Sequence, residues 1–281
     1  MTLWYEETFQ GTRLSLESIE TLYSGKSEFQ KIEIFETKAY GRALALDDVF
    51  MTSVKDEFMY HEMLTHPAML TAEDPKRVLV IGGGDGGTVR EVLRYPGVET
   101  CVMIEIDQGV VEACKEYLPM IGTAWDEPRL DLRFADGIDY VKNSDEEKYD
   151  VILLDGTDPV GPGEVLFAQE FFAACKRMMK PGGVLAMQSE TPILMQQVFF
   201  ETQGKLRELF AHVHPYFGPV PLYASGIWSW TWASDREGHL NLDHGRAAPI
   251  INGCRYYNDA IHQAAFAQPN YVRRGLAKLG G

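Results

Sequence analysis

The chain has 281 residues, of which 45% are hydrophobic, so it can hold one large α/β domain with a smaller appendage and can bury a full core. Its formal charge of −15 at pH 7 argues against a nucleic-acid backbone as partner and is compatible with cationic ligands, although solubility alone would also explain it. No stretch approaches the roughly 20 apolar residues of a membrane span, so we expect a cytosolic protein. The cysteines form no CxxC pair, so we expect reduced thiols at Cys101, Cys114, Cys175 and Cys254.

The first part of the chain predicts antiparallel strands. Its start, MTLWYEETFQ, has neither the basic nor the apolar region of a signal peptide. The segments QKIEIFET and GRALALDDVFMTS alternate apolar and polar residues and are interrupted at Gly25, Gly41 and LDD, which is typical of hairpins with one solvated face. We therefore expect a small N-terminal β-hairpin domain over residues 1–55.

The hydrophobic period changes after residue 55. The segment DEFMYHEMLTHPAML has helical spacing, with Phe58, Met59, Met63 and Leu64 on an apolar face. Five apolar runs then alternate with helical patterns: RVLVIGGG, TCVMIEID, LDLRFADG, YDVILLDG and GGVLAMQS. This rhythm predicts that residues 56–281 form an α/β domain with a Rossmann-like, doubly wound, mostly parallel sheet of the class I methyltransferase type.

Glycines and carboxylates follow the ends of these predicted strands, where ligands bind in such sheets. The first strand ends in a glycine loop, the second in Glu105, the third in Asp136, and the fourth in Asp155 and Asp158. A glycine loop alone would serve dinucleotides, S-adenosyl compounds or tight packing alike. An acid about twenty residues after such a loop is the usual partner of a ribose diol, so the combination favours an adenosine-type ligand.

Asp85, in the middle of the glycine loop, indicates which adenosine compound binds. Phosphates prefer bare amides and basic residues, yet this loop has no basic residue before Arg90. A fixed aspartate would also repel the carboxylate of S-adenosylmethionine. Decarboxylated S-adenosylmethionine has an aminopropyl ammonium instead, and it fits a negatively charged loop.

Six motifs in order carry a family resemblance across nearly the whole chain. They are DEFMYHEM, GGGDGG, EID, ADG, DGTDPVGPGE followed by LF, and CRYYNDAIHQAAFAQP. With these motifs the sequence resembles the polyamine aminopropyltransferases, and within that family most closely the spermidine synthases. The resemblance implies transfer of the aminopropyl group from decarboxylated S-adenosylmethionine, a co-substrate and not a prosthetic group, to putrescine, giving spermidine and 5′-methylthioadenosine.

The resemblance also implies residue roles. Asp155 would be the general base that removes a proton from the attacking amine, with Tyr60 helping to hold that amine. The positions matching the family's site for the co-substrate are Gln30, His61, Gly82, Gly84, Asp85, Glu105, Asp136, Gly137 and Pro162. Those matching its diamine site are Asp158, which would anchor the far ammonium, and the channel residues Tyr223, Gln188 and Trp4. Without the resemblance, ordinary packing would also explain the three channel residues, and His61 would also suit a core.

Other interpretations have less support. A methyltransferase on the same fold is disfavoured by Asp85 and by the paired acids of DGTD, and a non-catalytic partner subunit is disfavoured by the complete set of acids. HEMLTH resembles a zinc protease helix, but its histidines are five residues apart where that motif needs four, so we expect no metal site.

The sequence leaves two properties open. Putrescine is the acceptor that the resemblance favours, but cadaverine, spermidine and agmatine are not excluded. The family forms dimers or tetramers, so a homo-oligomer is expected, and the aromatic segment IWSWTWAS predicts a strand that is either buried or at a subunit interface.

Overall fold

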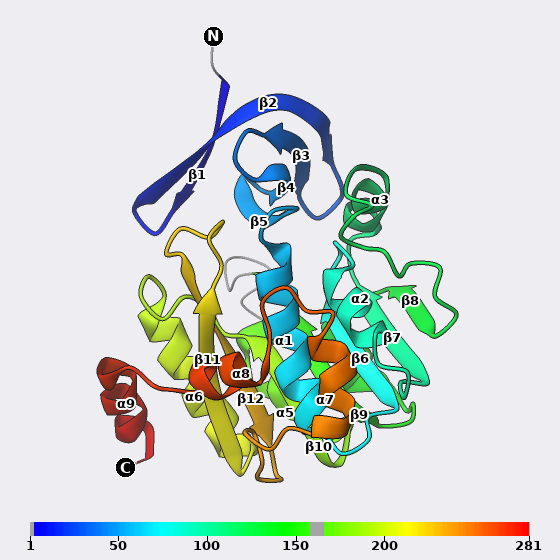
Figure 1. Cartoon of the computed structure of the whole chain (residues 1–281), viewed down its shortest axis with the longest axis vertical. Helices are drawn as coiled ribbons and strands as arrows, with labels where there is room; N and C mark the ends of the chain where they lie inside the picture. Colours follow the sequence, from blue (N-terminus) through cyan, green and yellow to red (C-terminus); the bar gives the residue numbers. More distant parts are fainter. Residues whose placement is uncertain (1–2, 158–165, 281) are drawn as a thin grey trace.

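The computed structural model describes residues 3–157 and 166–280, which form two sheets (Figure 1). The N-terminal sheet is antiparallel, with its strands in chain order. They are β1 (Leu3–Phe9), β2 (Thr12–Lys26), β3 (Lys31–Thr37), β4 (Gly41–Leu46) and β5 (Val49–Ser53).

The second sheet has the order β11-β12-β10-β9-β6-β7-β8. Its strands are β6 (Arg77–Gly82), β7 (Thr100–Glu105), β8 (Leu130–Phe134), β9 (Tyr149–Asp155), β10 (Met179–Gln188), β11 (His212–Pro219) and β12 (Ile227–Ser234). β6 to β10 pair in parallel, whereas β11 and β12 are antiparallel additions at one edge. The predicted Rossmann-like, mostly parallel sheet is therefore confirmed.

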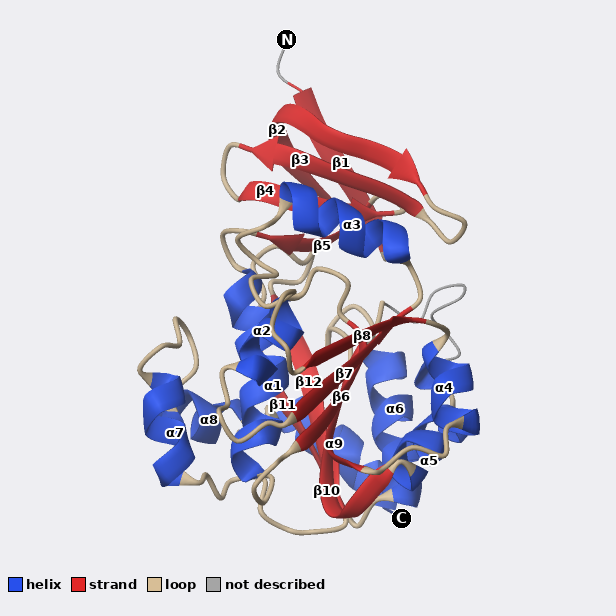
Figure 2. Ribbon diagram, turned by 90° about the vertical axis from the view of Figure 1, so that its right-hand side faces the viewer, coloured by secondary structure: helices blue, strands red, loops and turns tan. Residues whose placement is uncertain are grey.

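Helices cover both faces of this sheet (Figure 2). The described helices are α1 (Glu57–Thr71), α2 (Gly87–Leu93), α3 (Gln108–Tyr117), α4 (Gly137–Asn143), α5 (Gln169–Arg177), α6 (Gln196–Leu209), α7 (His244–Ile251), α8 (Asp259–Ala265) and α9 (Asn270–Ala277), followed by the short η2 (Lys278–Gly280); of these, α3 packs on the N-terminal sheet. Alternate residues of β6 enter different cores: Val78 and Val80 pack with residues of α1 and α2, and Leu79 and Ile81 with residues of α5. Because both faces are covered, the strands are continuous apolar runs.

Helix α1 is buried on every side, which differs from the single apolar face expected from its sequence. Phe58, Met63 and Leu64 are buried as predicted, but so are the polar Glu57 and Glu62, and of the fifteen residues only Met59 is not buried. The helix lies between the sheet and the helices α2, α7 and α8 (Figure 1). Its polar residues therefore need partners inside the protein.

The aromatic strand β12 is part of the core. It pairs with β10 on one side and β11 on the other, and Trp230 and Trp232 are fully buried. The alternative that this segment lies at a subunit interface is therefore wrong, because its large side chains are already enclosed by the chain's own elements.

Helix α3 joins the two sheets. Ile32 and Ile34 of the N-terminal sheet share a buried cluster with Val110 and Cys114 of α3, and Figure 2 shows the helix lying along that sheet. Since α3 follows β7 directly, this packing holds the N-terminal sheet beside the carboxyl end of β7.

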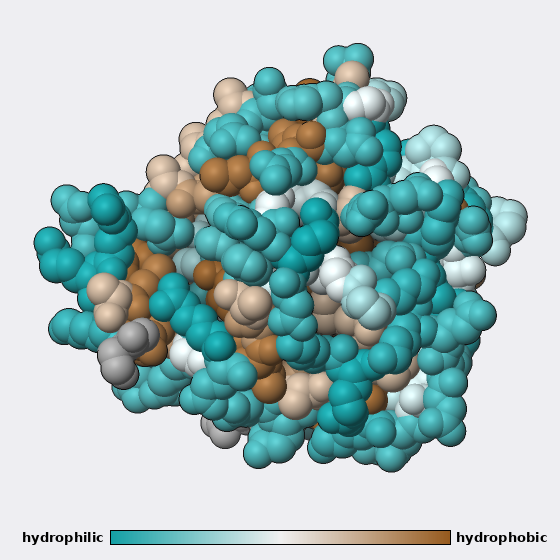
Figure 3. Space-filling view, turned by 90° about the horizontal axis from the view of Figure 1, so that it is seen from below, coloured by the Kyte–Doolittle hydropathy of each residue, from teal (hydrophilic) through white to brown (hydrophobic). Residues whose placement is uncertain are grey.

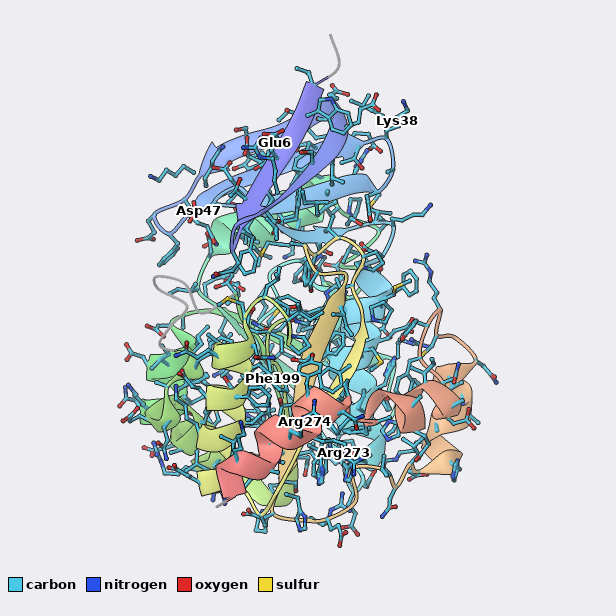
Figure 4. All side chains as sticks on the ribbon, turned by 90° about the vertical axis from the view of Figure 1, so that its left-hand side faces the viewer. Glu6, Lys38, Asp47, Phe199, Arg273 and Arg274 are labelled. Carbon is cyan, nitrogen blue, oxygen red and sulfur yellow. The ribbon has the colours of Figure 1, made fainter. Side chains whose placement is uncertain are left out.

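The lower face of the molecule is largely polar. The face seen in Figure 3 is hydrophilic over most of its area, with separate apolar patches. Figure 4 shows α9 against α6. Phe199 of α6 forms a small cluster with Val272 and Leu276 of α9, while Arg273 and Arg274 are exposed.

Among the described helices, none is long and apolar enough to cross a membrane. The four cysteines are free thiols.

Replacing Met69 of α1 tests the structural role of this helix. Met69 is fully buried, so Met69→Ala should lower the free energy of unfolding by about 2–5 kcal/mol. The measurement is urea denaturation followed by circular dichroism. Met120→Ala is the matched control, since Met120 is 44% exposed and its truncation should change stability by no more than about 0.5 kcal/mol. Equal effects of the two substitutions would contradict the central position of α1.

Candidate active site

The carboxyl ends of β6, β7, β9 and β10 bring together most of the residues predicted for the site. β6 and β9 are neighbours, and Gly82 pairs directly with Asp155 in the parallel register. Glu105 ends β7, next to β6, and Gln188 ends β10, next to β9. The site therefore lies at the edge of the sheet where doubly wound folds bind ligands.

The glycine loop lies in direct contact with Asp155. Gly82 has φ +84°, and a Cβ there would lie 2.2 Å from the carbonyl oxygen of Asp155. The Gly83 N–H donates to that same carbonyl oxygen at 3.0 Å. A Cβ on Gly84 would lie 3.3 Å from Oε2 of Glu105. There is therefore no room for side chains at the start of the glycine loop. The loop lies between the carboxylates of Asp155 and Glu105.

Asp155 is held by two hydroxyl groups. Tyr60 donates to Oδ1 at 2.8 Å, and Thr88 donates to Oδ2 at 2.6 Å. Burial raises the pKa of the Asp155 carboxyl above its usual range; the cation of His61 opposes this effect and the anion of Asp85 adds to it. The result is an oriented carboxylate with increased proton affinity.

Asp85 is paired within the protein. Its Oδ2 lies 3.2 Å from Nε2 of His61, and its Oδ1 accepts the Gly87 N–H at 2.9 Å. Burial alone would raise the pKa of Asp85, but His61, Gly87 and the charge of Arg90 outweigh it and lower the pKa. Asp85 is therefore a fixed anion.

Glu105 and Asp136 differ in their surroundings. Glu105 is 8% exposed, and its Oε1 accepts the Asp107 N–H at 2.8 Å. Burial raises the pKa of Glu105 to about 7. Asp136 is exposed and caps α4, where its Oδ1 accepts the Ile138 N–H at 2.7 Å. Gly137 begins that helix, and a Cβ there would lie 2.5 Å from Cγ2 of Ile81.

Gln30 comes from the N-terminal sheet and is tied to the region after β7. Its Nε2 donates to Oδ2 of Asp107 at 2.9 Å, and Ser27 donates to the same oxygen at 2.6 Å. Asp107 also caps α3, whose Gly109 N–H it accepts at 3.0 Å. This contact places Gln30 near Glu105.

Tyr223 and Gln188 lie on the β10 side of Asp155. The Tyr223 ring makes an edge contact with Tyr60, with ring centroids 6.2 Å apart, and its hydroxyl donates to the Met51 carbonyl at 2.9 Å. Gln188 is 3% exposed, and its Nε2 lies 3.4 Å from the Gly156 carbonyl oxygen.

One predicted residue is not brought to this group. Trp4 is 56% exposed on β1, opposite Glu17 in the register with β2. Asp158 and Pro162 lie outside the described residues. In the described part of the chain, no group of three or more His, Cys, Asp or Glu side chains could hold a metal ion.

The structure also adds residues that sequence reasoning missed. Thr88 contacts Asp155 from the start of α2, and Glu57 contacts His61 from one turn earlier in α1. The spacing of Glu57 and His61, four residues on one helix, is a signal that could have revealed their pairing. Thr88 has no such local signal, because its partner is 67 residues away.

Two family models match the chain. The spermine/spermidine synthase domain matches residues 57–243, and the spermidine synthase tetramerisation domain matches residues 3–53.

Curated relatives and solved structures agree with these matches. A polyamine aminopropyltransferase of Prochlorococcus marinus (strain NATL1A) is 43% identical over 279 residues, covering 98% of this chain and 96% of the relative. One of Shigella flexneri is 44% identical, covering 91% of this chain and 90% of the relative. A crystal structure of a spermidine synthase in complex with the transition-state analogue AdoDATO aligns with a TM-score of 0.95 and 39% identity, over 98% of this chain and 95% of that one. The spermidine synthase from Thermotoga maritima aligns with a TM-score of 0.91 and 37% identity, over 98% and 94%.

The raised pKa of Glu105 predicts a pH-dependent stability difference. A carboxyl group whose pKa is higher in the folded state than in the unfolded state stabilises the fold at low pH, and this stabilisation is lost as the pH rises to about 7. Between pH 5 and pH 8, Glu105→Gln should therefore gain stability relative to the unchanged protein, by up to about 3 kcal/mol. Urea denaturation at both pH values measures the difference. Glu28→Gln, at an exposed position, is the control and should show no such trend.

Proposed function

Because the chain belongs to the spermine/spermidine synthase family, we propose that the residues gathered around Asp155 carry out its aminopropyl transfer. The reaction moves the aminopropyl group of decarboxylated S-adenosylmethionine to putrescine and gives spermidine and 5′-methylthioadenosine. One observation carries the assignment of the base: a half-buried carboxylate of raised pKa, oriented by two hydroxyls, lies against the glycine loop.

Asp155 acts as the general base. Putrescine arrives as a diammonium ion, and the attacking nitrogen must lose a proton, to Asp155, before its lone pair can approach carbon. The nitrogen then attacks the methylene beside the sulfonium, the C–N bond forms as the C–S bond breaks, and the electron pair returns to sulfur. The leaving group is a neutral thioether, so it needs no acid. Positioning and the base supply the catalysis.

The co-substrate lies along the ends of β6, β7 and β8. Glu105 accepts the ribose hydroxyls and Asp136 the adenine amino group, while Gly82 and Gly84 allow close approach of the backbone. The carboxylate of Asp85, fixed by His61, faces the aminopropyl ammonium. Gln30 adds a contact from the N-terminal sheet. The order of these acids along the sheet edge supports this arrangement.

Putrescine occupies the β10 side of Asp155. Tyr60, Tyr223 and Gln188 are the walls of its channel, supported by their positions around Asp155. The roles of Asp158 as anchor of the far ammonium, of Pro162 and of Trp4 rest on the family resemblance alone.

The chain forms a homo-oligomer through its N-terminal sheet. This is supported by the match of residues 3–53 to a tetramerisation domain and by the exposed apolar side chains of Leu3, Trp4 and Ile19. We place the boundary between this unit and the catalytic unit at residue 55, in the link between β5 and α1. The four free thiols support a cytoplasmic location.

Product analysis tests the function. Purified protein is supplied with decarboxylated S-adenosylmethionine and equal amounts of putrescine, cadaverine, spermidine and agmatine, and the products are identified by mass spectrometry. We expect spermidine and 5′-methylthioadenosine as the main products. Asp155→Asn should lower kcat by about 10²–10⁴-fold, because the base is removed.

Two controls accompany this test. Asp145→Asn removes an exposed aspartate that precedes β9 and should keep full activity. S-adenosylmethionine should bind far more weakly than its decarboxylated form. Absence of any aminopropylated product would contradict the function, and equal binding of the two sulfonium compounds would favour a methyltransferase.

Removing the Tyr60 hydroxyl should shift the pH profile. This hydroxyl donates to the ionised Asp155 and so lowers the pKa of that carboxyl, and its loss in Tyr60→Phe should raise the pKa. The acidic limb of kcat/KM for putrescine should therefore move to higher pH by about one unit. Tyr216→Phe is the matched control: it removes a buried hydroxyl that donates to the Met63 carbonyl, away from Asp155. A limb that stays in place in Tyr60→Phe would exclude Asp155 as the titrating group.

A further inference from the structure

A continuous row of charged contacts runs from the glycine loop into the interior. Nε2 of His61 lies 3.2 Å from Oδ2 of Asp85, and Nδ1 of His61 lies 2.7 Å from Oε2 of Glu57. Glu57 in turn accepts from both terminal nitrogens of Arg90, at 3.1 and 2.9 Å. The four side chains are 4 to 16% exposed.

The two carboxylates hold His61 as an imidazolium. Each ring nitrogen faces an ionised carboxylate oxygen, which can only accept, so both nitrogens must donate. Burial alone would lower the pKa of His61, but Asp85 and Glu57 raise it well above its usual range. Among the other ionisable groups, Asp155 interacts electrostatically with both His61 and Asp85, whereas Tyr60, Cys114 and Arg90 interact with Asp85.

The ring has no room to move. A Cβ on Gly87 would lie 2.2 Å from Cε1 of His61, so the ring rests directly on the loop backbone. Glu57 is fixed as well, because Arg90 also donates to the Ile121 carbonyl at 2.9 Å and to Glu91 at 2.8 Å. The position of the Asp85 carboxylate is thus fixed by His61, which is itself held by Glu57.

We propose that Glu57 is a positioning residue for aminopropyl transfer: it keeps His61 donating to Asp85 and sets the charge that the aminopropyl ammonium meets. The inference rests on the proposed function. Glu57, His61 and Asp85 together carry one net negative charge, which is spread over three side chains. That charge is constant over the neutral pH range because His61 does not lose its proton there.

The substitution Glu57→Gln makes this charge depend on pH. The introduced amide is neutral, so one of the two carboxylates that raise the pKa of His61 is lost, and the pH at which the ring loses its proton falls toward the neutral range. Below that pH, His61 and Asp85 cancel and the ammonium is attracted weakly. Above it, the neutral imidazole still donates to Asp85 and one negative charge remains. Binding of the ammonium should therefore strengthen as the pH rises.

The experiment compares two ligands by calorimetry between about pH 5.5 and pH 8. Decarboxylated S-adenosylmethionine carries the ammonium and the sulfonium, and 5′-methylthioadenosine carries neither charge. Both contain the same adenosine, and the unchanged protein measures how the titration of Asp155 and Glu105 alters the ratio of their dissociation constants. Across this pH range the ratio should change by at least about tenfold more in Glu57→Gln than in the unchanged protein, in favour of the charged ligand at high pH.

The double variant Glu57→Gln with His61→Gln identifies the titrating group, and the pH dependence of its ratio should match that of the unchanged protein. The proposal would be overturned in favour of a purely structural role if the ratio in Glu57→Gln followed the unchanged protein, or if that variant lost 5′-methylthioadenosine binding. An additional change that persists in the double variant would also overturn it.

Histidine NMR of the unchanged protein needs no variant. Both nitrogens of His61 should remain protonated at about pH 7.5, and a neutral ring there would overturn the proposal. Failure of the proposed function is distinguishable, because the unchanged protein would then bind decarboxylated S-adenosylmethionine no better than S-adenosylmethionine.

Discussion

The burial of carboxylates at the ends of the central strands is the constraint on which the rest of the site depends. Asp155, Asp85 and Glu105 lie within one small region, and each would be costly there without hydrogen bonds or an opposite charge. The fold supplies these partners from α1 and the start of α2 for Asp155 and Asp85, and from the Asp107 N–H for Glu105. Tight glycine turns keep the loop's backbone close to the carboxylates. The arrangement therefore holds negative charge in place before any cationic ligand arrives.

Helix α1 meets this constraint because it is buried on all sides. Glu57, Tyr60 and His61 are three and four residues apart, so they share one side of the helix, and they contact residues at the ends of the strands. Glu62, on the same helix, accepts the backbone N–H groups of Arg255, Tyr256 and Tyr257, and so anchors the C-terminal segment as well. The motif DEFMYHEM thus combines core packing, support of the site and attachment of a distant segment in two helical turns.

Much of this architecture could be predicted from the sequence because its signals are local. The apolar runs in the sequence predicted the strands β6 to β10. An acid that follows a strand of a parallel sheet lies at the ligand-binding edge, and this rule predicted the positions of Glu105 and Asp155. The pairing of Asp85 with His61, the contact of Thr88 with Asp155 and the burial of Glu57 depend on how α1 crosses the sheet, and no local pattern specifies that crossing. For Trp4, a motif match did not predict the position of the side chain: the motif matches the family, but the side chain is exposed on β1.

Three neighbouring carboxylates acquire different properties from their surroundings, and this difference supports the roles proposed for them. The lowered pKa of Asp85, caused by an adjacent cation, makes it a permanent anion suited to hold an ammonium. The raised pKa of Asp155 suits a group that must take a proton during the reaction. Glu105, with a pKa of about 7, lies in a poorly hydrated place where ribose hydroxyls could replace the water that its charge lacks. Burial acts on all three carboxylates, and His61 acts on both Asp85 and Asp155, so a substitution of His61 should alter these two together. Thr88 contacts Asp155, so its substitution should act mainly on the general base.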